Sequence, residues 1–310
     1  MNLWYDAHVT VIQQSFIFML LALSIQVVLR AGVSSFASVA FYGIGGYVAA
    51  NLANGGLPFA ATLAVATVGS GVLGYLLFRP LNRLRGLYLG MVTFAIIQIV
   101  VVLATNGGDF TGGAIGLYGV PLQTTTGGLA LIALVAILAM SQLERSSLGR
   151  AFAAMRVDDN LAQAMGLEVR RLRTFVFALS AALGAASGAL NVLTFTVLAP
   201  GSFGFDLLVT ALTMAVVGGV TSWRGAVIGA IVVTWFPTIF TFLDGTAREI
   251  IYGLVVVLIM TYQPDGILGL LRSARRRLQE RHAHRNAKLG AESDLAHDAA
   301  LLSETEKEPT

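Results

Sequence analysis

The sequence predicts an all-α polytopic membrane protein with about nine transmembrane helices, within a range of eight to ten. Only 12% of its 310 residues are charged and 56% are hydrophobic, whereas soluble domains carry about 25% charged residues. Residues 31–78 contain no formal charge, which is enough apolar chain for two membrane crossings of about 20 residues each. Arginines gather between the apolar runs, as is typical of proteins that cross the membrane repeatedly.

Nine apolar segments follow one another along the chain, most of them separated by short polar or glycine-containing connections. The segments are 11–29, 36–53, 58–78, 87–105, 128–143, 174–198, 205–222, 225–243 and 247–263. Cytoplasmic loops of membrane proteins are enriched in Lys and Arg. Three arginines follow the third segment, six lie in 144–173, and five follow the last segment at 272–281. We therefore expect the amino terminus outside and the carboxyl terminus in the cytoplasm.

The second segment is expected to depart from a plain helix. Three serines and three glycines lie between Ser34 and Gly46. Irregular backbone at membrane depth is tolerated only where protein or a water-filled cavity satisfies its polar groups. A broken or re-entrant helix is one interpretation of this stretch, and close helix packing through small residues is the other.

Small and polar positions near such irregular stretches are candidates for lining a translocation pathway. The external glycine-rich loop 106–127 offers backbone amides near its start, although a flexible surface connection is an equal interpretation of it. The second half of the chain has its own run of glycines after residue 217. The candidate pathway residues are Ser34, Ser35, Tyr42, Thr111, Gly112, Gly113, Gly218 and Gly219.

Several classes of function are disfavoured by missing residues. The chain has no cysteine, and its four histidines lie near the two ends of the sequence, so we expect no metal site and no catalytic residue in the membrane. No G-x-x-x-x-G-K-[ST] motif is present to hold nucleotide phosphates. Acidic relays within the apolar segments are nearly absent, although ion-driven carriers commonly use them. The chain is therefore not expected to be an enzyme, and any energy for pumping must come from a partner.

The polar segment 144–173 is expected to be a cytoplasmic docking element. Ser147 is a possible N-cap, and a helix is predicted from about Arg150 to Met165, ending at Gly166. Its predicted apolar face comprises Phe152, Met155 and Leu161. Its predicted water-facing residues are Arg156, Asp158 and Asp159. An amphipathic helix lying on the membrane surface is the alternative.

Residues 1–271 are predicted to form one transmembrane domain, followed by a polar cytoplasmic tail at 272–310. The basic run 272–288 is expected to lie near anionic membrane lipid, and the acidic run after it is expected to be disordered. Membrane topology explains the net charge of +3 better than nucleic-acid binding does.

The sequence SLGRAFAAMRVDDNLAQAMG resembles the coupling-loop region of bacterial branched-chain amino-acid ABC permeases of the LivH/LivM type. That family shows a Ser-x-x-Gly-Arg-Ala start, an acidic pair and an Ala-x-x-x-Gly-(Ile/Leu) end. The matching residues are Ser146, Gly149, Arg150, Ala151, Asp158, Asp159, Ala162, Gly166 and Leu167. The segments 111–121, 216–230 and 264–267 continue the resemblance, and the first of them favours the LivM-like branch. The family's usual Ser-x-Gly-His appears here as Ser35-Phe36-Ala37-Ser38, so the solute stays open.

The resemblance implies a permease subunit of an ABC importer in the bacterial cytoplasmic (inner) membrane. Its partners would be a second homologous permease, two ATPase subunits that bind ATP and Mg, and an extracytoplasmic solute-binding protein. The solute would be a branched-chain or other neutral amino acid. The residues implied in ATPase coupling are Gly149, Arg150, Ala151, Asp158, Asp159, Ala162 and Gly166, with Gly149 allowing close approach of the ATPase.

Two alternatives follow from the same sequence. The family also includes importers for urea and short amides and for some aromatic acids. A function of another class, a self-contained channel or facilitator, would transport solute without ATP or partners.

Overall fold

The computed structural model describes residues 3–239 together with 253–254, 261, 266 and 269. The chain divides into two compact units, 1–267 and 268–310, and the fold below is that of the first unit. The predicted tail at 272–310 lies outside the described residues, as does nearly all of the ninth apolar segment.

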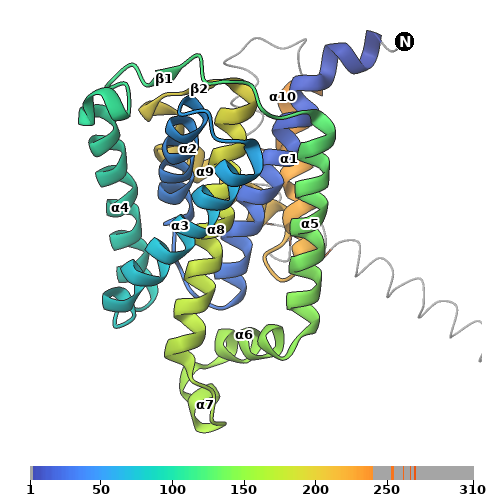
Figure 1. The fold of residues 1–310 in the computed structure, drawn as a ribbon. Helices are drawn as coiled ribbons and strands as arrows, with labels where there is room; N and C mark the ends of the chain where they lie inside the picture. The colour runs from blue at the N-terminus through green and yellow to red at the C-terminus, as the bar shows by residue number, and fades with distance from the viewer. Residues whose placement is uncertain (1–2, 240–252, 255–260, 262–265, 267–268, 270–310) are drawn as a thin grey trace, which may run out of the picture. The chain divides into compact units, whose positions relative to one another are not determined.

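Helices account for most of the described chain (Figure 1). They are α1 (Leu3–Arg30), α2 (Ser38–Asn54), α3 (Phe59–Leu81), α4 (Gly86–Asn106), α5 (Thr126–Arg145), α6 (Ser147–Val157), α7 (Asp159–Ala164), α8 (Val169–Phe195), α9 (Phe205–Gly218) and α10 (Trp223–Ile239). Short 3-10 turns occur at Gly108–Phe110 and Pro200–Phe203. Two short strands, β1 (Leu117–Tyr118) and β2 (Val197–Leu198), pair antiparallel with Leu117 opposite Leu198.

The predicted mostly helical membrane protein is confirmed in outline. Among the described residues, six segments are long and apolar enough to cross a membrane: His8–Arg30, Phe59–Leu81, Gly86–Asn106, Thr126–Arg145, Val169–Phe195 and Pro200–Gly218. α2 and α10, with 17 residues each, are shorter. The predicted number of about nine crossings therefore depends on short helices and on a segment that the structure does not describe.

α1, α2 and α8 form the centre of the unit, and α3, α4 and α5 present exposed apolar side chains outward. α8 packs closely on α2 through small residues. A Cβ atom added at Gly184 or Gly188 would collide with the backbone of Ser38 or Tyr42, and one added at Gly45 would collide with Ala185. This is the close backbone approach that small residues permit between membrane helices.

The irregular stretch predicted near Ser34–Gly46 is confined to its first part. Residues 33–36 are non-helical, and the amide of Phe36 donates a 3.0 Å hydrogen bond to the hydroxyl of Thr93 in α4. From Ser38 onward α2 is an unbroken helix. Its glycines serve close packing instead, which is the alternative that the sequence left open.

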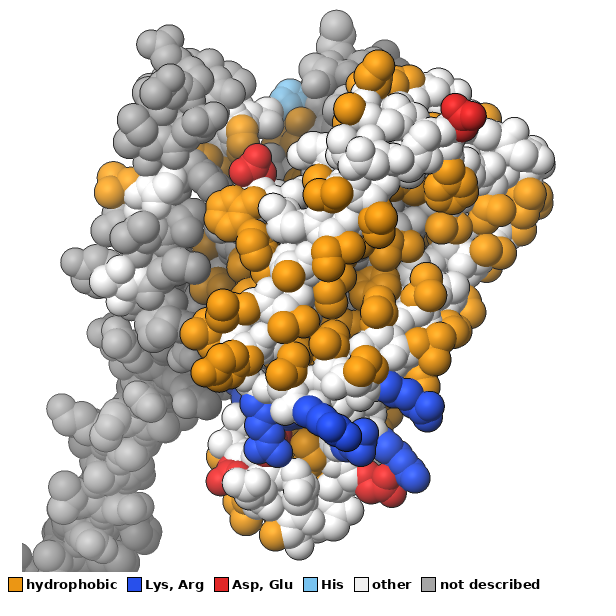
Figure 2. Space-filling model, turned by 90° about the vertical axis from the view of Figure 1, so that its left-hand side faces the viewer, with side chains coloured by type: hydrophobic (Ala, Val, Ile, Leu, Met, Phe, Trp, Pro, Cys, Tyr) orange, Lys and Arg blue, Asp and Glu red, His pale blue; other side chains and the backbone are white. Residues whose placement is uncertain are grey.

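The two ends of the unit differ in composition. One end holds α6 and α7, and the other holds β1 and β2 together with the amino-terminal end of α1 (Figure 1). A row of basic side chains lies below a broad apolar surface, on the α6–α7 side (Figure 2). We call the exposed arginines of α3, of the α3–α4 turn and of the start of α8 the arginine belt: Arg79, Arg83, Arg85, Arg170 and Arg171.

Candidate functional site

The segment 144–173 folds into two helices rather than the single helix predicted over Arg150–Met165. The break falls at Asp158, whose backbone is extended (φ −156°, ψ 119°). Its carboxylate accepts hydrogen bonds from the amides of Asn160 at 2.7 Å and Leu161 at 3.2 Å. An N-cap residue of this kind adopts non-helical backbone, so capping α7 ends α6.

α6 begins at Ser147 rather than at about Arg150, and its N-cap lies one residue earlier than predicted. Ser146, not Ser147, is the N-cap, and its hydroxyl accepts from the amide of Gly149 at 3.4 Å. Gly166 lies just after α7 with a positive φ of 84°, a conformation that favours glycine. The predicted end of the helical region at Gly166 therefore agrees with the structure.

The apolar face of α6 packs under the bundle. Phe152 and Met155 are buried, as the sequence predicts, together with Ala151. Gly149 is also buried, and a Cβ atom there would collide with the carbonyl oxygens of Leu143 and Glu144 at the end of α5. The structure thus gives Gly149 a role inside the chain, at a tight corner between α5 and α6. Arg150 is exposed on the opposite side of α6.

The predicted acidic pair separates into two structural roles. Asp158 is exposed and caps α7. Asp159 is half-buried and forms an ion pair with Arg173 of α8, while one carboxylate oxygen lies 3.9 Å from a guanidinium nitrogen of Arg85. The expectation that Asp159 faces water is therefore wrong, because this charge pairs with arginines at the foot of α8. Ala162 is buried beside it.

Three apolar side chains project from the end of α6 and from α7. Val157 is 83% exposed, Leu161 57% and Met165 73%. Val157 ends α6, Leu161 lies in α7 and Met165 follows α7, and we call these three residues the exposed stripe. Leu161 was predicted to share one apolar face with Phe152 and Met155, but it does not share their burial, because the break at Asp158 changes the direction of the helix after it. Hydrophobic side chains are visible beyond the arginines in Figure 2.

Glu144 connects three parts of the bundle, and the sequence alone did not single it out. Its carboxylate forms an ion pair with Arg30 at the end of α1. It also accepts hydrogen bonds from the amide of Trp223 at 2.6 Å and from the hydroxyl of Ser222 at 3.3 Å. The sequence offered one signal: Arg30 and Glu144 lie at the ends of two apolar segments, on the same predicted side of the membrane.

The turn after α1 lies against α6. Gly32 has a positive φ of 71°, and a Cβ atom there would lie 2.9 Å from the Cα of Arg156. The non-helical residues 33–36 follow directly. α6 therefore contacts the point at which the chain turns from α1 toward α2.

The candidate pathway residues lie in three separate places. Ser34 and Ser35 belong to the non-helical stretch, and Tyr42 is buried in α2. Thr111, Gly112 and Gly113 belong to the loop that leads to β1, at the opposite end from α6. Gly218 and Gly219 are buried where α9 turns into α10, beside the residues that Glu144 holds. Their role in transport stays a prediction.

Comparisons with known proteins identify the family. Residues 8–261 match the family described as "Branched-chain amino acid transport system / permease component". The high-affinity branched-chain amino acid permease LivM of Escherichia coli K12 is 28% identical, over 83% of this chain and 68% of the relative. The permease BraD of Pseudomonas aeruginosa is also 28% identical, over 77% of this chain and 86% of the relative.

The permease LivH of Salmonella typhimurium is 29% identical, but over only 45% of this chain and 46% of the relative. The greater coverage by LivM relatives agrees with the predicted LivM-like branch. No solved structure matches this chain. Because the family match spans residues 8–261, the chain belongs to the family of permease components of branched-chain amino acid transport systems.

Proposed function

We propose that this chain is the permease subunit of an ABC importer for branched-chain or other neutral amino acids. An extracytoplasmic binding protein would deliver the solute, and a second, homologous permease would complete the pathway. Two partner ATPase subunits would bind ATP and Mg and supply the energy. The family and the named relatives support the amino-acid importer, and the exposed stripe supports docking of a partner.

The exposed stripe is the observation that carries the coupling proposal. Val157, Leu161 and Met165 are far more exposed than the apolar residues of α6, and they lie beyond the arginine belt. Arginines gather on the cytoplasmic side of membrane proteins, so the stripe would extend into water. Apolar side chains gathered on a water-facing surface mark protein contacts. The same reasoning supports the proposed orientation, with the amino terminus outside and α6 and α7 in the cytoplasm.

The contacts of α6 supply a route from the ATPase to the membrane helices. A partner that binds the stripe moves α7 and the end of α6 together. α6 touches the turn after α1 at Gly32, and the end of α5 holds Arg30 and the α9–α10 turn through Glu144. Movement of α6 and α7 would thereby be transmitted to α1, α9 and α10.

The coupling residues implied by the resemblance take definite parts in this proposal. Gly149 and Ala151 hold α6 against the bundle, and Asp159 and Ala162 fix α7 to the foot of α8. Asp158 and Gly166 define where α7 begins and ends. Arg150, which is exposed, remains available for a polar contact with the ATPase.

The solute pathway follows from the same geometry. Ser34 and Ser35 lie just after the turn that α6 contacts, so their segment would respond to movement of the coupling helices. Thr111, Gly112 and Gly113 are at the opposite end, where the binding protein would release its solute. Urea, short amides and aromatic acids are the competing solutes, to be tested by uptake in proteoliposomes that contain the whole complex.

Leu161→Glu tests the coupling proposal. It places a charge in the centre of the stripe without filling a buried site, so membrane insertion should be unchanged. We expect the ATPase subunits to be lost from the complex purified in mild detergent, together with a loss of ATP-dependent uptake of at least about tenfold. Gln163→Glu adds the same charge to an exposed position on another face of α7 and should retain both.

Two results would contradict this proposal. Full recovery of ATPase subunits with Leu161→Glu would exclude the stripe as the docking surface. Solute flux through the purified chain in liposomes without ATP or partners would instead favour a channel or facilitator.

A further inference from the structure

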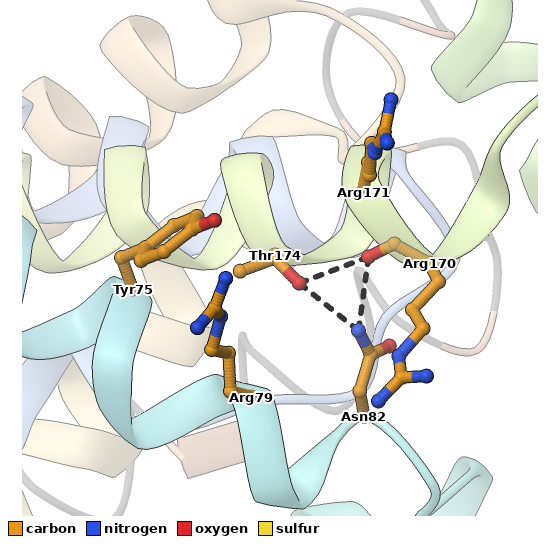
Figure 3. Close-up of a pocket in the computed structure, with 6 residues that line it drawn as sticks. All are labelled: Tyr75, Arg79, Asn82, Arg170, Arg171 and Thr174. Carbon is orange, nitrogen blue, oxygen red and sulfur yellow. Dashed lines mark hydrogen bonds between the residues drawn. The ribbon is translucent and has the colours of Figure 1, made fainter.

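A cavity of about 590 Å³ lies at the membrane-facing side of the arginine belt, where α3 ends and α8 begins. It is separate from the exposed stripe. The residues that line it are Tyr75, Arg79, Asn82, Arg170, Arg171 and Thr174 (Figure 3). Nothing in the coupling proposal uses this cavity.

The floor of the cavity is a closed set of hydrogen bonds. The amide nitrogen of Asn82 donates to the carbonyl oxygen of Arg170 and to the hydroxyl of Thr174, both at 2.9 Å. The hydroxyl of Thr174 donates to the same carbonyl at 2.9 Å. These bonds fix the distance between α3 and α8 and leave ligand binding to the charged side chains above them.

Two guanidinium groups lie on either side of this floor. Figure 3 shows Arg79 and Arg170 on opposite sides of Asn82, and Arg171 directed away from both. Arg171 pairs with Glu168. Within the described part of the chain, Arg79 and Arg170 form no ion pair with an acid. Two exposed positive charges therefore flank the cavity without a negative charge to compensate them.

The neighbouring surface adds to this positive potential. A second cavity of about 460 Å³ shares Asn82 and Arg170 with the first, and Arg83, Arg85 and Arg173 line it together with one acid, Glu168. Arg85 and Arg173 face Asp159, and Glu168 pairs with Arg171. Among the described residues this leaves Arg83 as the further arginine that would attract an anionic group at the first cavity.

The other border of the cavity is apolar and faces outward. Val72, Leu73 and Leu76 of α3 are 54%, 46% and 54% exposed. They lie one to two helical turns before Arg79, and Figure 2 shows a broad apolar surface above the basic row. Tyr75 is also exposed, and the guanidinium of Arg79 lies over its ring at 5.3 Å from the centroid. Tyr is enriched at the level of lipid headgroups.

We propose that Arg79 and Arg170 bind the phosphate of an anionic phospholipid, whose acyl chains lie on the exposed apolar face of α3. Guanidinium groups bind phosphate oxygens with paired, charge-assisted hydrogen bonds. Basic pockets on the cytoplasmic side of membrane helices suit lipid headgroups. The apolar border favours a lipid over a soluble protein, because a bound protein would have to meet the α3 surface inside the bilayer.

The test uses the intact permease, purified with its complex in mild detergent and returned to phosphatidylcholine bilayers with increasing phosphatidylglycerol. Lipid retained per permease is measured by mass spectrometry, and affinity is measured by titration. Arg79→Gln combined with Arg170→Gln is expected to weaken phosphatidylglycerol binding about 25-fold, since each basic side chain near anionic lipid contributes about fivefold. Arg79→Lys keeps the charge but loses the paired hydrogen bonds of the guanidinium, so it should lose less binding than Arg79→Gln.

Arg224→Gln is the matched control. Arg224 is exposed, and its guanidinium lies over the Trp223 ring at 5.5 Å, but it does not line the cavity. Its removal should leave phosphatidylglycerol binding unchanged. An equal loss in this control would show a general effect of net charge and would overturn the proposal.

Three further results would overturn it. Wild-type lipid retention by the double variant would exclude these arginines as the site. Equal competition by inorganic phosphate would indicate a site for free phosphate. Loss of the ATPase subunits by the double variant, with lipid retention unchanged, would make the cavity a subunit contact. If the double variant elutes as a single, well-folded species, its loss of lipid binding is a local effect and does not result from unfolding.

Discussion

α6 and α7 come from one polar segment, yet they are attached to the bundle in opposite ways. α6 has 11 residues and buries Phe152 and Met155 beneath the membrane helices. α7 has six residues, exposes Leu161, and is fixed by its cap and by the ion pair between Asp159 and Arg173. The first attachment is mainly apolar burial, and the second is mainly a small number of polar contacts, with Ala162 as the one buried apolar side chain of α7.

This difference indicates how the two helices divide the proposed coupling. A helix of six residues is too short to be stable alone in water, so α7 depends on its cap and its ion pair. α7 can therefore adjust to a partner at a modest energetic cost, whereas α6 must move together with the helices it packs against. The next three predictions test this contrast, from the largest expected effect to the smallest.

Phe152→Ala should have the largest effect, because Phe152 is fully buried between α6 and the bundle. Loss of such a ring costs about 3–5 kcal/mol. We expect a clear fall in the thermal stability of the purified permease and protease cleavage within 147–157. Phe175→Ala removes a ring that is 44% exposed and should change stability far less. Similar losses in the two variants would contradict the apolar attachment of α6.

Asp159→Asn should release α7 without releasing α6. It leaves the guanidinium of Arg173, which is 9% exposed, without its main partner, at a cost of about 3 kcal/mol. Hydrogen exchange should accelerate at the amides of α7 and stay slow in α6. Asp158→Asn is the paired control, since Asn is as good an N-cap as Asp. If both variants behave alike, the separate roles assigned to the two acids are wrong.

Asp158→Ala should have the smallest effect of the three, about 1 kcal/mol, through loss of the cap of α7. The matched variant Ser146→Ala removes the cap of α6. Because burial also stabilises α6, exchange in α6 should change less than exchange in α7. Equal acceleration in the two helices would show that α6 depends on its cap as much as α7 does.

The broad architecture could be predicted because membrane crossings depend on local composition. Long apolar runs such as those of α4 and α8 are visible in the sequence itself. The sequence predicted a non-helical stretch near the correct serines, but it did not predict that helix α2 begins at Ser38. The start of α2 depends on how closely Gly184 of α8 packs against it. Close packing of this kind requires two segments that are more than 140 residues apart in the sequence.

The site was predicted less well, because its key features depend on which residues meet. Asp is a favoured N-cap residue and Val157, Asp159 and Asn160 are weak helix formers, so the break at Asp158 had a local signal, whereas the contacts that follow from the break had none. Once the helix breaks there, Leu161 becomes exposed and Asp159 reaches Arg173. Glu144 was missed for the same reason: its partners Arg30 and Trp223 lie far away in the sequence.

The contact of α2 with α8 has a mechanical consequence. Where the two backbones meet at the glycines, no side chain can slide or change rotamer, so we expect the two helices to tilt as one rigid body. α8 has 27 residues, a length of about 40 Å, and it begins just after α7. At that length, a tilt of only about 5° about the foot of α8 displaces its far end by about 3.5 Å. Small displacements at one surface of this protein are thereby enlarged at the other.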